Sequence, residues 1–354
     1  MEIMPADKDP FRPANLATRT LGLLGDDALS DPTADSYLVK VGRRAMACQF
    51  QVFLNAGQYV DGCPIAIEAL DLVEKLEAQM TVYRPESEIS TINREAACGP
   101  VDVESELFDL LARSVALWKV TDGAFDITAG PLSEVWGFAR RQGRMPSQDE
   151  LQEALTGVGS QWLRLNRDDQ SIHFEREEVQ INLGAIGKGE ALDRAAAILT
   201  DSGIGDYLFH GGQSSVLARG NRAGSDGWMV GLVHPLHPQR RIGQIRLRDR
   251  ALSTSGSGTQ FFTHRGRRYG HILDPRTGQP AAGMLSCTVI APTAAEGDAL
   301  STALFVMGPA AAADWCRSRP EISAILIYPG RKPGTVSTET INLGDNEWHA
   351  TAST

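Results

Sequence analysis

Strand-like and helix-like hydrophobic patterns alternate irregularly along this chain of 354 residues. Residues 46–54 place apolar side chains at every second position, which is typical of a half-buried strand. Residues 64–80 place them three or four apart instead, and Pro64 suits the first turn of a helix. Later strand patterns often follow one another without a helix between them. We therefore expect an α+β fold with mixed or antiparallel sheets and packed helices rather than a doubly wound sheet.

The other elements are predicted from the same two periods and from glycine and proline signals. Pro85 is expected to stop any helix in residues 81–93, a second amphipathic helix covers 104–120 before Gly123, and residues 124–138 are expected to form a loop. Short strands are expected at 162–166, 171–175 and 179–183, and a glycine-rich turn at 184–189 leads into a helix. The rest of the chain is expected to hold strands at 207–220, 227–235, 242–249, 251–256, 285–292 and 322–329, and helices at 297–308 and 309–318.

No linker-like stretch divides the chain into comparable domains. We expect an N-terminal extension at residues 1–40, which is rich in Asp, Pro and Ala and partly disordered or packed on the surface. One folded domain is expected at residues 41–330, followed by a C-terminal tail at 331–354. The extension has no apolar core of signal-peptide length, and no stretch is long enough to span a membrane, so a cytoplasmic protein is expected.

The formal net charge of −10 argues against a general nucleic-acid-binding protein, because neutralising phosphates requires a basic surface. The five cysteines are widely spaced and form no CxxC pair. Free thiols in a reducing compartment are therefore expected rather than a disulfide framework or a zinc site.

The segment EGDALSTAL is the strongest local signal for chemistry. In a helix, Asp298 and Thr302 lie four residues apart on one face, with Ser301 beside them. Carboxylate and hydroxyl oxygens are ligands that suit Mg²⁺. An Asp in the first turn of a helix also interacts favourably with the helix dipole, and the spacing alone favours this structural interpretation.

Two further segments allow both a functional and a structural interpretation. The turn NLGAIGKGE could bind an anion through backbone N–H groups and Lys188, or it could be only a tight connection between strand and helix. In RRYGHILDPRTGQP, His271 could do chemistry, or the segment could be a strand that runs into a turn. Asp274 is expected to hold that turn together with Gly278.

Taken in order, seven segments resemble the ApbE-like family of FAD:protein FMN transferases over residues 46–329. They are MACQFQVFL, EAQMTVYRPESEISTIN, DGAFDITAGPLSEVWGF, INLGAIGKGEALDRAA, HGGQSSVLARG, LSTSG with RRYGHILDPRTGQP, and GDALSTALFVMG. The resemblance implies an α+β, T-fold-related architecture for the domain at 41–330.

The resemblance also implies roles for particular residues. FAD is expected to lie against Met46, Tyr83, Ala124, Phe125, Asp126, Asn182, Lys188 and Ile272. Mg²⁺ is expected on the backbone oxygen of Ala185 and on Asp298 and Thr302, with help from Ser301. His271 matches a histidine near the transferring phosphate and is expected to act as the base.

The implied reaction is a phosphotransferase-type transfer of FMN from FAD to a Thr or Ser hydroxyl of a target flavoprotein, with release of AMP. A monomer or homodimer is expected. Gly270, Gln213 and Ser257 differ from the residues usual in the family, which has Ser, an acidic residue and Asp there. Two alternatives therefore remain open, a FAD-binding protein without transfer activity and a FAD pyrophosphatase that gives FMN and AMP.

Overall fold

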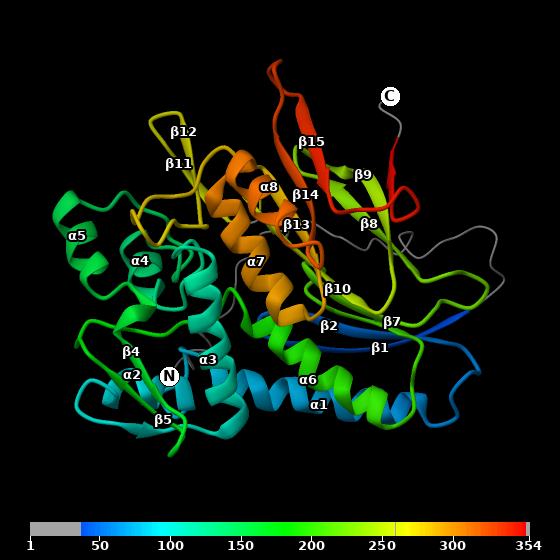
Figure 1. The fold of residues 1–354 in the computed structure, drawn as a ribbon, viewed down its shortest axis with the longest axis horizontal. Coiled ribbons are helices and arrows are strands. Elements are labelled where there is room, and N and C mark those ends of the chain that lie inside the picture. The colour runs from blue at the N-terminus through cyan, green and yellow to red at the C-terminus, as the bar shows by residue number, and fades with distance from the viewer. Residues whose placement is uncertain (1–36, 259, 352–354) are drawn as a thin grey trace, which may run out of the picture.

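The computed structural model describes residues 37–258 and 260–351, and its central element is an eight-stranded antiparallel sheet. Figure 1 shows the sheet with helices on one face and a smaller sheet on the other. The strands follow one another across the sheet in the order of the chain. They are β1 (Leu38–Ala45), β2 (Cys48–Asn55), β6 (Tyr207–Gly211), β7 (Ser215–Arg219), β10 (Arg250–Gly256), β13 (Ser286–Ala291), β14 (Ser323–Pro329) and β15 (Val336–Ile341).

The two faces of this sheet bury different side chains, because successive residues of a strand point to opposite faces. Val52 and Phe209 belong to the core on the helical face, whereas their neighbours Phe53 and Leu208 belong to the core on the other face. The helices on the first face are α1 (Gly62–Met80), α6 (Gly187–Asp201), α7 (Ala294–Met307) and α8 (Pro309–Arg317). The second face is covered by a three-stranded sheet of β8 (Trp228–His234), β9 (His237–Leu247) and β16 (Trp348–Ala350).

A smaller lobe lies to the left of the main sheet in Figure 1 and is built mostly from the chain between β2 and β6. Its helices are α2 (Glu88–Glu95), α3 (Ser105–Val120), α4 (Gly130–Val135) and α5 (Gln148–Thr156), with a single 3-10 turn at Ser160–Trp162. Its sheet contains β3 (Val101–Asp102), β5 (Ser171–Phe174) and β4 (Leu163–Asn166). The hairpin of β11 (Phe261–His264) and β12 (Arg267–Gly270) lies beside this lobe.

The predicted α+β class with antiparallel sheets and packed helices is confirmed, but several local predictions are wrong. Pro85 does not prevent α2, because Ser87 caps a new helix through the N–H of Ser90. Residues 124–138 contain the short helix α4. Residues 179–183 are not a strand, since the N–H and carbonyl of Ile181 bond to the side chain of Asn93 instead of a neighbouring strand.

The ends of the predicted domain also differ from the structure. β1 begins inside the range predicted as an extension, most of which lies outside the described residues. The predicted tail supplies β15, which pairs with β14 in the main sheet, and β16, which pairs with β9. Within residues 37–258 and 260–351 no helix is long and apolar enough to cross a membrane. All five cysteines are free thiols, as predicted.

Candidate active site

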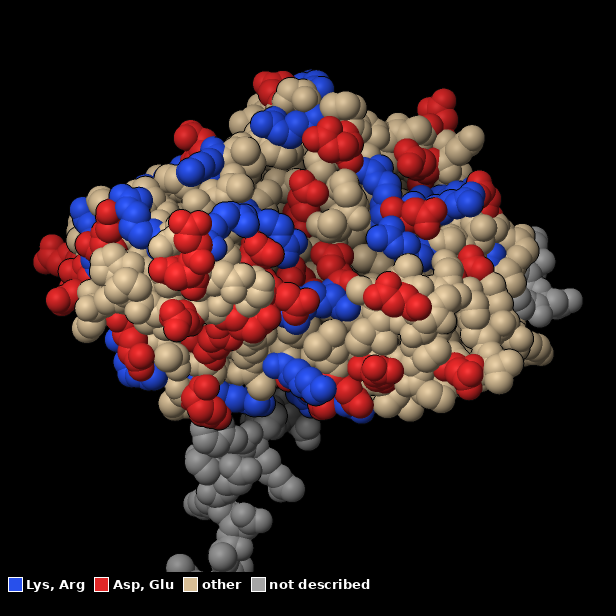
Figure 2. Space-filling model, turned by 60° about the horizontal axis from the view of Figure 1, so that its bottom comes forward, with Lys and Arg blue, Asp and Glu red and all other residues tan. Residues whose placement is uncertain are grey.

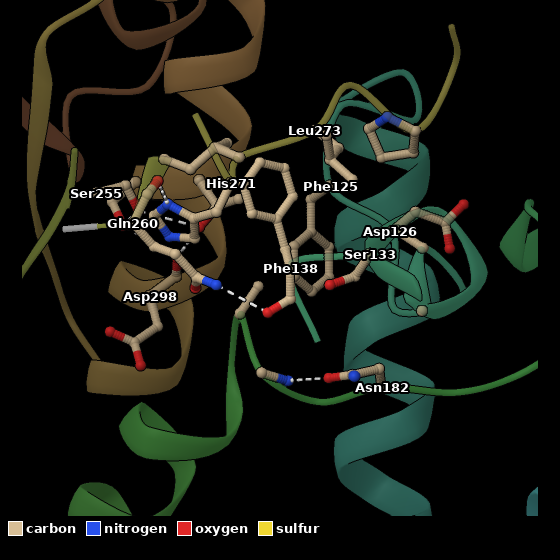
Figure 3. Close-up of a pocket in the computed structure, with 18 of the residues that line it drawn as sticks. Phe125, Asp126, Ser133, Phe138, Asn182, Ser255, Gln260, His271, Leu273 and Asp298 are labelled. Carbon is tan, nitrogen blue, oxygen red and sulfur yellow. Dashed lines mark hydrogen bonds between the residues drawn. The ribbon is translucent and has the colours of Figure 1, made fainter. Parts of the chain in front are cut away.

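A cavity of about 460 Å³ lies between the first turn of α6, the second and third turns of α7, the loops on both sides of α4, and the segments that follow β10 and β12. Every residue predicted from the sequence for the site lines it, except Met46. Met46 lines an adjoining cavity of about 300 Å³, which shares Tyr83, Asn182 and Lys188 with the first. Figure 3 shows Ser255, His271 and Asp298 on one side of the larger cavity and Phe125, Ser133 and Asn182 on the other.

The glycine-rich turn before α6 has a structural role that also shapes the site. A methyl group on Gly189 would come closer than 3.0 Å to the carbonyl oxygen of Ala294, so only glycine allows α6 to approach the start of α7 this closely. At the same contact the N–H of Gly189 donates to Asp298 Oδ2 over 2.8 Å. Asp193 of α6 caps α7, accepting from the N–H groups of Ala294 and Ala295 at 2.8 Å each. The structural interpretation of this turn, a tight connection into α6, is therefore confirmed, and Lys188 lines the cavity.

Asp298 projects from α7 into a cluster of hydroxyl groups. The side chain is only 6% exposed, and its Oδ1 accepts a hydrogen bond of 2.6 Å from Ser215 Oγ. Ser255 Oγ lies 2.9 Å from Ser301 Oγ and 3.0 Å from Thr302 Oγ1. Lys188 Nζ is 3.8 Å from Asp298 Oδ2 and supplies a positive charge at the same wall.

The oxygen atoms of this cluster fit a hard cation such as Mg²⁺, which favours few protein oxygens together with water and phosphate. One carboxylate and several hydroxyls face the cavity, and Ala185 is close by on the same wall. In the part of the chain that the structure describes, no three His, Cys, Asp or Glu residues gather as a complete metal site. A cation here would therefore depend on hydroxyl and carbonyl oxygens, water or phosphate beside the single carboxylate of the cluster.

His271 is held in a defined orientation by the backbone of Gln260. Its Nδ1 lies 3.1 Å from the carbonyl oxygen of Gln260, and its backbone N–H donates to the same oxygen over 3.1 Å. Because a carbonyl can only accept, the proton of a neutral ring belongs on Nδ1 and leaves Nε2 as an acceptor. Burial lowers the pKa of His271 below its usual value, and the positive charge of Lys188 lowers it further. The imidazole is thus favoured in its neutral, basic form.

An aromatic cluster attaches the β11–β12 hairpin to the loop after α4. Phe262 stacks on Tyr269 with ring centroids 5.3 Å apart, and Tyr269 stacks on Trp136 at 5.8 Å. The ring centroid of Phe138 lies 5.7 Å from that of Phe262 and 6.5 Å from that of His271, and its contact with His271 is T-shaped. The side chain of Gln260 donates to the carbonyl of Phe138 over 2.8 Å. These contacts join two segments far apart in the chain and fix the wall that carries His271.

The turn after His271 is structural, as predicted. Asp274 accepts hydrogen bonds from the N–H and side chain of Arg276, and its carbonyl accepts from the N–H of Gly278 over 2.8 Å. Gly278 has a φ of +70°, which favours glycine, and its carbonyl accepts from the indole N–H of Trp136 over 2.8 Å. The turn is thereby tied to the aromatic cluster.

Asp126 lines the cavity, but its carboxylate bonds to the protein. It accepts hydrogen bonds from the N–H and hydroxyl of Thr128 and from the N–H and hydroxyl of Ser160, at 2.7 to 3.0 Å. The side chain is 8% exposed. Asp126 therefore fixes the loop that presents Ala124 and Phe125 to the cavity.

Several residues of the site were not singled out from the sequence. Gln260, Phe138 and Ser215 carry no spacing signal, because each acts through a partner distant in the chain. Ser255 lies in the TSG segment, and its hydroxyl neighbours Ser301 and Thr302 form one cluster with it only after β10 packs against α7.

Comparisons with known proteins agree with this geometry. The model of the ApbE family matches residues 46–326. The FAD:protein FMN transferase of Escherichia coli K12 is 30% identical over 257 residues, which cover 69% of this chain and 73% of that protein. The Vibrio cholerae enzyme of the same name is 32% identical over 243 residues, covering 67% and 71%.

Solved structures show the same likeness across more of the chain. The ApbE protein of Thermotoga maritima has a TM-score of 0.77 and 30% identity, and the match covers 86% of this chain and 97% of that one. The apo form of the Pseudomonas stutzeri flavinyl transferase ApbE has a TM-score of 0.76 and 26% identity, covering 87% and 96%. The resemblance seen in the sequence is therefore confirmed, and the chain belongs to the ApbE family of flavin transferases.

Proposed function

We propose that this protein transfers FMN from FAD to a Thr or Ser hydroxyl of a target protein and releases AMP, in a reaction that needs Mg²⁺. The observation that carries the proposal is the meeting of a neutral His271 and the Asp298 hydroxyl cluster in one cavity. A base and a site for phosphate charge are the two requirements of phosphoryl transfer to a hydroxyl. The relatives' names support the transfer of FMN from FAD to a protein.

His271 would act on the acceptor hydroxyl. A hydroxyl is a weak nucleophile, and the free Nε2 of a neutral imidazole can take its proton as the oxygen attacks phosphorus. The new bond joins that oxygen to the phosphorus of the FMN half, and the bond that breaks is the one to the bridging oxygen, which leaves with AMP. The hydrogen bond from Nδ1 to Gln260 keeps the ring in the correct tautomer and orientation.

Asp298, Ser301, Thr302 and the carbonyl of Ala185 would hold Mg²⁺. When bound, the ion would neutralise charge on the pyrophosphate as a Lewis acid. Lys188 is placed to offset the remaining negative charge, being 3.8 Å from Asp298 Oδ2. We assign the flavin and adenosine parts to the walls that contain Tyr83, Phe125, Asn182 and Ile272, and to the adjoining cavity at Met46.

The proposal is tested by incubating the protein with FAD, Mg²⁺ and a candidate acceptor protein, and by following AMP release and the acceptor's mass. A mass gain of one FMN per AMP released is the expected result. AMP and free FMN without a mass gain would instead identify a pyrophosphatase. A stable FAD complex with no product would identify a binding protein, and absence of FAD binding would contradict the whole assignment.

Two variants separate the proposed roles. His271→Asn retains a donor for the Gln260 carbonyl but has no base, so transfer should fall about 10²–10⁴-fold while FAD binding is retained. His349→Asn, at an exposed position on β16, is the matched control and should leave transfer unchanged. Asp298→Asn should abolish Mg²⁺-dependent transfer. Transfer at the wild-type rate in either site variant would refute its assignment.

A further inference from the structure

Five arginine side chains on two segments next to the cavity lining form no ion pair with a carboxylate of the described residues. They are Arg140, Arg141, Arg265, Arg267 and Arg268, called here the arginine rim, and all are exposed. Among the ion pairs of the described residues, none involves the arginine rim. The two segments that carry it, 139–147 and 256–273, contain no Asp or Glu at all.

The arginine rim is one surface, because its two segments pack on each other. The aromatic cluster and the bond from Gln260 to Phe138 join the hairpin to the loop after α4. Within that loop Gly143 lies directly against the ring of Phe262, where a methyl group would overlap the ring. The hairpin stands beside the α4 lobe in Figure 1, so both segments lie at the same edge of the molecule, with Arg267 and Arg268 on opposite faces of the hairpin.

Two members of the rim are held in place by aromatic rings. The guanidinium of Arg268 lies 3.5 Å over the ring of Phe261, and its Nη2 donates to the carbonyl of Ser257 over 2.6 Å. The guanidinium of Arg267 lies 5.2 Å from the centre of the Tyr269 ring. Stacked arginines lose less conformational entropy when they bind a carboxylate, which favours recognition of a second molecule.

The rim is next to the reaction centre but outside the cavity. Arg140 directly follows Ala139, and the hairpin lies between Gln260 and His271, all three of which line the cavity. None of the five arginines lines either cavity assigned to FAD. The segments that carry the rim therefore adjoin the cavity lining, while the rim arginines themselves stay outside both cavities.

The charge of the rim contrasts with that of the whole chain. The formal net charge is −10, and Figure 2 shows a face of the molecule on which Asp and Glu side chains gather among Lys and Arg. An acidic partner would be repelled by the molecule as a whole and attracted at this edge, which directs it toward the cavity mouth.

We propose that the arginine rim is the docking surface for an acidic segment of the acceptor protein, next to the hydroxyl that receives FMN. The inference rests on the proposed function, since it names the chemistry of the partner at the same site. Bidentate pairs between arginine and carboxylate would hold the segment while its Thr or Ser reaches the cavity.

Labelled peptides test the charge preference directly. Three peptides share a central Thr and differ only in the flanking residues, which are Asp, Asn or Lys. Binding to the FAD-saturated protein is followed by fluorescence anisotropy at low and high salt. The Asp peptide is expected to bind about tenfold more tightly than the Asn peptide at low salt, and the difference should shrink as salt rises. Equal affinity of the three peptides would overturn the proposal.

Charge reversal locates the effect. Arg141→Glu with Arg265→Glu should remove the preference for the Asp peptide, whereas Lys75→Glu with Arg240→Glu makes the same change in charge on α1 and β9 and should retain it. FAD affinity, measured by flavin fluorescence, should be unchanged in both. Loss of FAD affinity in the rim variant would assign the arginines to the dinucleotide and overturn the docking surface.

These readouts distinguish the two proposals. Charge-dependent binding of the Asp peptide without any FMN transfer by the wild-type protein would refute the proposed function alone. Transfer to an acceptor protein at the same rate in wild type and rim variant, with equal KM, would refute the docking surface alone.

Discussion

Replacing Gly189 with alanine tests how the close contact between α6 and α7 builds the site. The added methyl group would lie closer than 3.0 Å to the carbonyl oxygen of Ala294, which belongs to the backbone and cannot rotate away. The two helices must therefore separate. Gly187, two residues earlier in the same helix, offers a matched control, since its methyl group would meet its nearest neighbour, Leu183, at an ordinary 3.6 Å.

The expected magnitude follows from two opposing terms. Overpacking costs about 1–3 kcal/mol, and the upper end applies because backbone rather than a flexible side chain is in the way. Alanine is more favourable than glycine in a helix by about 1 kcal/mol. We therefore expect Gly189→Ala to lower the free energy of unfolding by about 2 kcal/mol and Gly187→Ala to leave it unchanged or raise it by up to about 1 kcal/mol.

Urea unfolding and thermal melting measure this difference. A loss of about 2 kcal/mol corresponds to a fall in Tm of about 3 °C, since the entropy of unfolding is about 2.1 cal/mol/K per residue and the chain has 354 residues. Gly189→Ala should also weaken transfer, because the N–H of Gly189 donates to Asp298 and moves with the helix. A Gly189→Ala protein as stable as Gly187→Ala would refute the argument that close approach requires this glycine.

Three further predictions use other parts of the molecule. Burial lowers the pKa of His210 from 6.5 to about 4, so its contribution to stability is complete above pH 6.5 and is lost as pH falls toward 4. Between pH 6.5 and 4, the free energy of unfolding measured in urea should therefore fall by about 3 kcal/mol less in His210→Gln than in the wild type. An equal fall in both proteins would contradict the assignment. Asp126→Asn places an amide donor opposite the N–H groups of Thr128 and Ser160, which already donate. The free energy of unfolding should therefore fall by about 2 kcal/mol. A smaller fall than for Asp→Asn at an exposed position would be inconsistent with these hydrogen bonds. The exposed thiols of Cys63 and Cys98 should react rapidly with a thiol reagent that releases a chromophore, and the half-buried Cys48 slowly, because burial raises its pKa to about 11. Cys287 and Cys316 are buried and should react only after unfolding, and early release from all five thiols would contradict this order.

The parts of the fold that depend on local patterns could be predicted from the sequence. The strand β2 and the helices α1 and α3 follow clear hydrophobic periods, whereas α7 is apolar and buried nearly all round. Helix α2 was missed because a proline two residues before its cap hides the capping signal. Residues 179–183 have the composition of a strand, but their backbone groups bond to Asn93, which no local pattern reveals.

The site was predicted unevenly for a similar reason. Asp298, Ser301 and Thr302 share one helix face, so their spacing in the sequence identifies them as a group. Ser215 and Gln260 lie on other elements, and only the packing of the sheet on α7 and of the hairpin on α4 brings them to Asp298 and His271. The resemblance to a known family supplied the remaining residues, which isolated motifs left ambiguous.

The order of strands in the main sheet has a consequence for synthesis on the ribosome. Each strand from β1 to β15 pairs with the one made before it in the sheet, so the growing chain can add strands in the order of their emergence. The helix that carries Asp298 follows β13, late in this series. The hydroxyl cluster around Asp298 can therefore assemble only after six of the eight strands of the main sheet have been made.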